Sequence, residues 1–130
     1  FSRQIIEDQK AVSARVHDVI SLRKAGTLLE TADRDVDWVH FSNADAVAIY
    51  FKMYGIASPT IGTTAPELVW PMPLGSVANP LTGGFGGADG LISDVFTAAI
   101  YVSADKTAGT GTNATDQLED VNVRLATRAG

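Results

Sequence analysis

The chain has 130 residues, 45% hydrophobic and 19% charged, which is typical of one globular domain with a single core. Its net charge of −5 argues against a general nucleic-acid-binding surface, because phosphate binding needs clustered lysine and arginine. The sequence has no cysteine, which excludes disulfides and thiolate zinc sites, and no apolar run approaches the ~20 residues of a membrane-spanning helix. We therefore expect neither a nucleic-acid nor a membrane partner.

The first eleven residues, FSRQIIEDQKA, are predicted to form an N-terminal arm outside the folded core. Charged and amide side chains dominate this segment and leave Ile5 and Ile6 as its apolar anchor. Burying two such side chains does not offset the entropy of fixing some ten residues, so the arm needs contacts from a neighbouring subunit. We place the arm at residues 1–11 and a single domain at residues 12–130.

Strand-like alternation of apolar and polar residues begins near Val12 and continues, with a turn at residues 23–26, to about Phe41. A turn cluster, SNAD, separates this part from the strongest predicted strand, AVAIYFKMY at residues 46–54. A period of two gives this strand one apolar face, made of Val47, Ile49, Phe51 and Met53, and a second face made of Tyr50, Lys52 and Tyr54.

The second half of the chain predicts further strands between loops rich in glycine, proline and threonine. Pro71 and Pro73 place the strand ELVWPMPLG at a sheet edge or end it early, because proline donates no hydrogen bond to a ladder. The glycine-rich residues 79–90 are predicted to be a loop. A strand within residues 91–104 and a last strand, residues 118–127, complete the pattern.

Seven or eight strands with turns between them, and no long helical period, predict an all-β fold. The spacing favours an antiparallel β-sandwich of jelly-roll or related topology. Its core is predicted to contain the apolar faces of the strongest strand and of the last one: Val47, Ile49, Phe51, Met53, Val121, Val123 and Leu125.

No residue pattern predicts a metal, a cofactor or a catalytic site. Asp33, Asp35 and Asp37 resemble the start of a calcium loop, but the required glycine and glutamate are missing, so we expect a solvated strand face. The two histidines, His17 and His40, have no neighbouring ligand type. We therefore predict a protein that is not an enzyme and binds no metal or cofactor.

Two other patterns have a functional and a structural interpretation. The run GGFGGADG, residues 83–90, lacks both the dinucleotide fingerprint and a Walker lysine, which favours a loop tip over a phosphate site. Trp38, Trp70 and the tyrosines could form a sugar-stacking platform, but aromatic residues on strands more often belong to a core or an interface.

Two long segments carry a family resemblance: NADAVAIYFKMYGIASPTIGTTAPELVWPMPLG and GADGLISDVFTAAIYVSADKTAGTGTNATDQLEDVNVRLA. This pattern, over about residues 26–126, is similar to small structural proteins of tailed bacteriophages and prophages. The resemblance implies a jelly-roll capsid decoration (cement) protein in the virion, which bridges capsomers by binding the major capsid protein and itself, as a trimer. The alternative is a tail or fibre-base domain that binds host-surface glycan through Trp70, Trp38 and the loop tips.

The resemblance also implies where such a protein would touch its neighbours. Lys52 and the tyrosines beside it would lie on the surface, available for subunit contacts. The predicted contact residues for other subunits or the capsid are Ile5, Ile6, Tyr50, Lys52, Tyr54, Trp70 and Phe85.

Overall fold

The computed structural model describes residues 14–86, 92, 95–110 and 116–129. These residues form eight strands and no helix, and therefore no helix that could cross a membrane. The strands are β1 (Arg15–Val19), β2 (Thr27–Glu30), β3 (Arg34–Asn43), β4 (Ile49–Tyr54), β5 (Leu68–Met72), β6 (Leu81–Gly86), β7 (Ile100–Asp105) and β8 (Val121–Ala129). The predicted N-terminal arm, with Ile5 and Ile6, lies outside the described residues.

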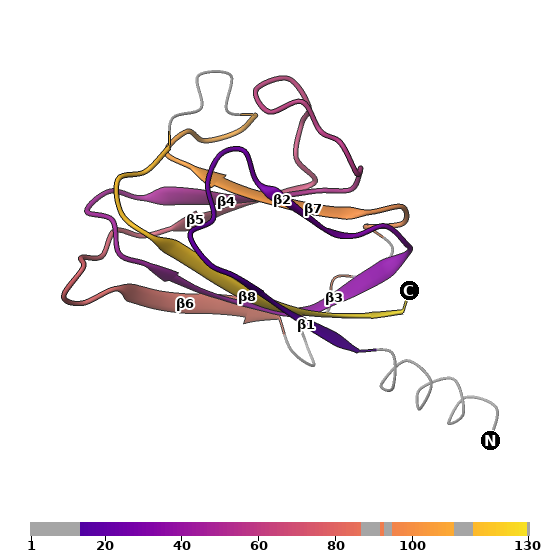
Figure 1. Ribbon diagram of the computed structural model, residues 1–130, viewed down its shortest axis with the longest axis horizontal. Coiled ribbons are helices and arrows are strands. Elements are labelled where there is room, and N and C mark those ends of the chain that lie inside the picture. Colours follow the sequence, from indigo (N-terminus) through magenta and orange to yellow (C-terminus); the bar gives the residue numbers. More distant parts are fainter. Residues whose placement is uncertain (1–13, 87–91, 93–94, 111–115, 130) are drawn as a thin grey trace.

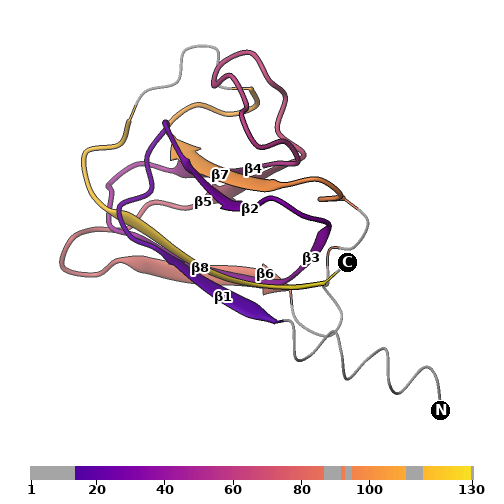
Figure 2. The ribbon, with the colours of Figure 1, turned by 45° about the vertical axis from the view of Figure 1, so that its right-hand side comes forward.

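The strands form two four-stranded sheets, β1-β8-β3-β6 and β2-β7-β4-β5, in which every neighbouring pair is antiparallel. Figures 1 and 2 show the two sheets stacked as layers, with β1 near β2 on one side of the sandwich. This strand order is that of a jelly roll, with two Greek keys. The predicted all-β sandwich is confirmed.

The core lies between the sheets and follows the predicted alternation of two strands. Ile49, Phe51 and Met53 of β4 are buried, and so are the inward residues of β8, Val121, Val123 and Leu125. The prediction for Val47 is wrong, since this side chain is 44% exposed. The reason is a turn before β4, where the Asn43 side chain accepts the Asp45 N–H at 2.9 Å and the Asp45 side chain accepts the Val47 N–H at 3.2 Å.

Residues 79–90 were predicted to be a loop, and this prediction is wrong for Leu81–Gly86. These residues form strand β6 beside β3. Glycine is required there for close packing. A Cβ atom on Gly83 would lie 2.8 Å from the Phe41 ring, and one on Gly84 would lie 2.2 Å from the Val39 carbonyl oxygen. The missing side chains that suggested a loop are what let this strand approach β3.

The proline-bracketed strand lies where the sequence places it. β5 is at the edge of its sheet and ends at Met72, before Pro73. Pro71, within β5, is tolerated because an edge strand needs hydrogen bonds on only one side. The next predicted strand is shorter than expected: β7 begins at Ile100, and Phe96 before it is a buried residue whose carbonyl accepts the Arg34 N–H at 3.1 Å.

Candidate interaction surface

The acidic and histidine residues do not form a metal centre in the described part of the chain, where no three potential ligands converge. Asp35 is buried and Asp37 accepts a hydrogen bond from Arg128 at 2.6 Å, so the prediction of three carboxylates on one solvated face is wrong. A register shift between Val36 and Trp38 interrupts the alternation of β3 at this point.

His17 belongs to a polar cluster that joins the two sheets on the β1–β2 side. The buried Glu30 carboxylate lies 2.8 Å from His17 Nε2 and accepts a hydrogen bond from Arg15 at 2.9 Å. Arg34 and Thr127 complete the cluster. Burial disfavours the Glu30 carboxylate, but the His17 hydrogen bond and the charges of Arg34 and Arg15 outweigh it, so its pKa lies below the ordinary value.

Lys52, predicted to be a surface contact residue, is fully buried, and that expectation is wrong. Its Nζ atom lies 3.0 and 2.9 Å from the two carboxylate oxygens of Asp105, which is also fully buried. Residues 55–67, between β4 and β5, rise over the outer side of this sheet in both ribbon views. An outward direction on β4 therefore does not mean exposure to solvent.

The two tyrosines flanking Lys52 differ in exposure. Tyr54 is fully buried, which raises the pKa of its hydroxyl above the ordinary value, so its predicted place on the surface is also wrong. Its ring meets Tyr101 edge-on at 6.1 Å. Tyr50 is half-buried, and its subunit contact stays a prediction.

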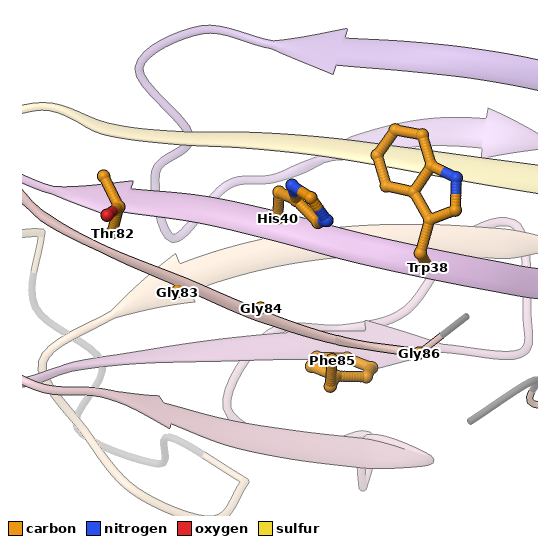
Figure 3. A pocket seen from close by; sticks show the side chains of 7 residues that line it. All are labelled: Trp38, His40, Thr82, Gly83, Gly84, Phe85 and Gly86. Atoms are coloured by element: carbon orange, nitrogen blue, oxygen red, sulfur yellow. The ribbon is translucent and has the colours of Figure 1, made fainter. Parts of the chain in front are cut away.

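The outer face of the β1-β8-β3-β6 sheet carries an open hollow of about 600 Å³ between β3 and β6. In Figure 3, Trp38 and His40 point to the same side of β3, and their ring centres are 4.9 Å apart. The residues opposite them on β6 are Gly86 and Gly84, so no side chain fills the space beside the rings. Thr82 lies at the far end of the hollow.

Trp38 and Trp70 do not form one platform. Trp70, on β5, packs against Phe85 of β6 with ring centres 4.5 Å apart, and both rings are half-buried. Phe85 points to the side of β6 opposite Trp38 and His40 (Figure 3). The Trp70–Phe85 pair therefore joins the edges of the two sheets, while Trp38 faces outward.

The Trp70–Phe85 pair belongs to a segment of the chain that contains no ionisable residue. Residues 68–86, which comprise β5, the connection to β6 and β6 itself, contain no Asp, Glu, Lys, Arg or His, although 19% of the chain is charged. On the connection, Leu74 is 60% exposed and Val77 is 67% exposed. We call residues 68–86 the uncharged side.

The uncharged side has the composition of a protein interface rather than of a solvated surface. The core of an interface is depleted in charged residues and enriched in aromatic ones, and contiguous exposed apolar residues mark binding sites. The opposite side, formed by β1 and β2, carries Arg15, Asp18 and Glu30. The absence of charge across residues 68–86 can be read from the sequence, and our sequence analysis missed it.

Comparisons with known proteins do not assign a family. No protein-family model matches the chain, and the search of curated proteins finds no significant relative.

Proposed function

We propose that the chain is a non-enzymatic structural protein of a tailed-phage virion, and that it stabilises the head as a decoration protein by bridging capsomers. The observation that carries the proposal is the uncharged side, with Leu74 and Val77 exposed on it. A surface of this kind gains free energy when it is covered by another protein. The resemblance of residues 26–126 supplies the virion context.

The proposed mechanism is non-covalent binding at many symmetry-related contacts, with no chemical reaction. Each copy would bury strand and loop surface against the major capsid protein and against other copies, which the resemblance suggests form a trimer. Many modest contacts of the same kind, repeated by symmetry, would together resist the internal pressure of packaged DNA.

Several ionisable groups within the described residues are held in ion pairs or in hydrogen bonds to the backbone. These structural roles support a function without catalysis. Lys52 is neutralised by Asp105, and Glu30 by its basic neighbours. Asp45 accepts backbone hydrogen bonds from Leu118 and Glu119 at 2.8 and 3.0 Å. These hydrogen bonds outweigh the effect of burial and lower the pKa of Asp45, so this carboxylate holds a loop in place.

The test is binding of the purified chain to phage heads that lack it. We expect saturable binding and a higher temperature of DNA release from decorated heads. Val77→Lys should weaken binding, because it places a charge on the uncharged side. Val16→Lys is the control, since Val16 is 51% exposed on β1, a strand that already has charges. Absence of head binding, or equal loss of binding in both variants, would overturn the proposal.

A second function, glycan binding by a tail or fibre-base domain, is favoured by one observation. The hollow beside Trp38 and His40 combines ring faces with the hydroxyl of Thr82, the mixture of aromatic surface and a few polar groups that small-molecule sites have. Trp70 would not take part, because it packs against Phe85. Quenching or a shift of tryptophan fluorescence on adding host glycan, lost in Trp38→Ala but kept in Trp70→Phe, would support this function. A fluorescence response lost in Trp70→Phe instead would exclude the hollow.

A further inference from the structure

A sheet edge presents unpaired backbone N–H and C=O groups, and proteins protect such edges with charges, prolines, bulges or very short strands. The sandwich has four edge strands among its described residues, and three of them carry such a device. β1 has Arg15 and Asp18, β5 has Pro71, and β2 is a four-residue strand with a register shift between Leu28 and Glu30.

The fourth edge strand, β6, has none of these devices. Its sequence, Leu-Thr-Gly-Gly-Phe-Gly, has no charge and no proline, and its six residues pair with β3 without a register shift. Because alternate residues of an antiparallel strand face opposite neighbours, half of the β6 backbone groups point away from β3. No described strand pairs with them. Thr82, Gly83, Gly84 and Gly86 are exposed, so these four residues place no large side chain in the way of an approaching strand.

We propose that β6 pairs with β6 of a second copy of this chain, antiparallel and about a two-fold axis. The choice of partner follows from the comparison of the edges. A β1 strand of another copy would bring Arg15 and Asp18 against an uncharged surface, and a β5 strand would bring Pro71, which lacks the N–H that a ladder needs. Among the described edges, β6 alone has neither a charge nor a proline nor a register shift, so a pair of β6 strands satisfies the requirement in both copies.

The two-fold arrangement would also cover part of the uncharged side. The half-buried Trp70–Phe85 pair of each copy lies beside the β6 edge, so docking brings two aromatic pairs close to the axis. The β1-β8-β3-β6 sheets of the two copies would merge into one continuous sheet. Cross-strand pairing would then be combined with burial of apolar surface, the two contributions that stabilise obligate interfaces.

The β6–β6 contact adds one contact between copies of the chain to the proposed function. The contact can exist whether or not the chain decorates phage heads, because its tests use the purified protein alone. A two-fold contact cannot by itself close a trimer. If the resemblance to trimeric decoration proteins also holds, the β6 contact would connect two trimers and the free protein would form even-numbered assemblies.

The first test is sedimentation of the full chain across a concentration series. We expect an even-numbered species, and Thr82→Lys should raise its dissociation constant about tenfold, because it places like charges on both paired edges. Val16→Lys on β1 is the matched control and should leave the dissociation constant unchanged. Thermal melts of both variants show whether each still folds. A monomer at all concentrations, or equal weakening by the two variants, would overturn the proposal.

The second test measures which edges lie together. Because the chain has no cysteine, Thr82→Cys and Val16→Cys each provide one site for a nitroxide spin label. With strands about 4.8 Å apart, β6 and its copy are one spacing apart and the two β1 strands are seven, so the label distances should differ by about 30 Å. A Val16 distance equal to or shorter than the Thr82 distance would overturn the pairing, even if a dimer forms.

Discussion

Lys52 and Asp105 connect the two central strands of the β2-β7-β4-β5 sheet through a pair of charges with no solvent contact. Desolvating both charges is expensive, and their attraction compensates only when the geometry is good. Here both carboxylate oxygens lie within 3.0 Å of Nζ, and Asp105 also accepts the Thr107 N–H at 2.7 Å. The pair therefore links β4 to β7 in the middle of the sheet, where Lys52 lies opposite Ser103 and Tyr50 opposite Asp105.

Removing Lys52 alone should be strongly destabilising. Lys52→Met leaves Asp105 buried without a counter-charge, and we expect a loss of about 3–5 kcal/mol in the free energy of unfolding. The double variant Lys52→Met/Asp105→Asn removes both charges and should recover a large part of that loss. Urea denaturation of the two variants measures the difference. A single variant within about 1 kcal/mol of the original chain would mean that the pair is hydrated in solution.

The lowered pKa values of Glu30 and Asp45 predict a stability that falls in acid. The unfolded chain takes up protons at the ordinary carboxylate pKa, whereas the folded chain holds these groups ionised to lower pH. The contribution is thus present above the ordinary pKa and is lost as pH falls through the folded value. Melting temperatures from pH 7 to pH 3 should decline less steeply in Glu30→Gln than in the original chain. An unchanged slope would contradict the role of Glu30.

At the scale of the element, β6 depends on glycine more than any other described strand. Gly86 combines a φ angle of +106° with close packing, since a Cβ atom would lie 2.6 Å from both the Asp37 carbonyl oxygen and the Trp38 Cα atom. The neighbouring atoms are backbone and cannot move aside. The end of β6, and the hollow beside Trp38, therefore require glycine at this position.

Gly86→Ala should destabilise the protein more than an alanine substitution at a glycine with a positive φ angle but no close neighbours. Gly109 is the matched control, because its φ is +67° and a Cβ atom added there would meet no other atom within 4 Å. We expect Gly109→Ala to cost about 1 kcal/mol of folding free energy and Gly86→Ala clearly more. Equal losses in denaturant melts would show that β6 can move away from β3.

The whole molecule is asymmetric, with a charged side at β1 and β2 and an uncharged side at β5 and β6. Glu30 and its basic partners close the sandwich on the first side, and the Trp70–Phe85 pair closes it on the second. The first side also exposes apolar side chains, Val16 and Leu28, but only the second combines exposed apolar residues with a strand pair free of charged residues, as the core of an interface is. The proposed assembly contacts therefore concentrate on residues 68–86, with the predicted N-terminal arm as a separate contact.

Deleting residues 1–11 should weaken assembly while leaving the fold intact. Burying Ile5 and Ile6 would contribute on the order of 3–6 kcal/mol, less than the roughly 1–2 kcal/mol per residue needed to order the segment. The melting temperature of the dissociated subunit should be nearly unchanged, and binding to heads should weaken. Ile5→Ser/Ile6→Ser is the matched variant, which keeps the length and charges. Unfolding on deletion, or unchanged head binding, would show that the arm has another role.

The sequence by itself determined the all-β class, the inward faces of β4 and β8, and the restriction of β5 to a sheet edge or an early end. These features depend on local rules: a period of two puts Phe51 and Val123 on inward faces, and proline cannot donate to a ladder. The uncharged composition of residues 68–86 was equally readable, because it is a property of one continuous segment.

Only the tertiary structure decided which outward-facing residues are covered and which edge is unprotected. Lys52 alternates like a surface residue, yet it is buried with Asp105, which lies 53 positions away in the chain. The glycines of β6 resemble a loop until β3 is placed beside them. Both outcomes depend on contacts between segments far apart in sequence, and such contacts leave no periodicity in either segment alone.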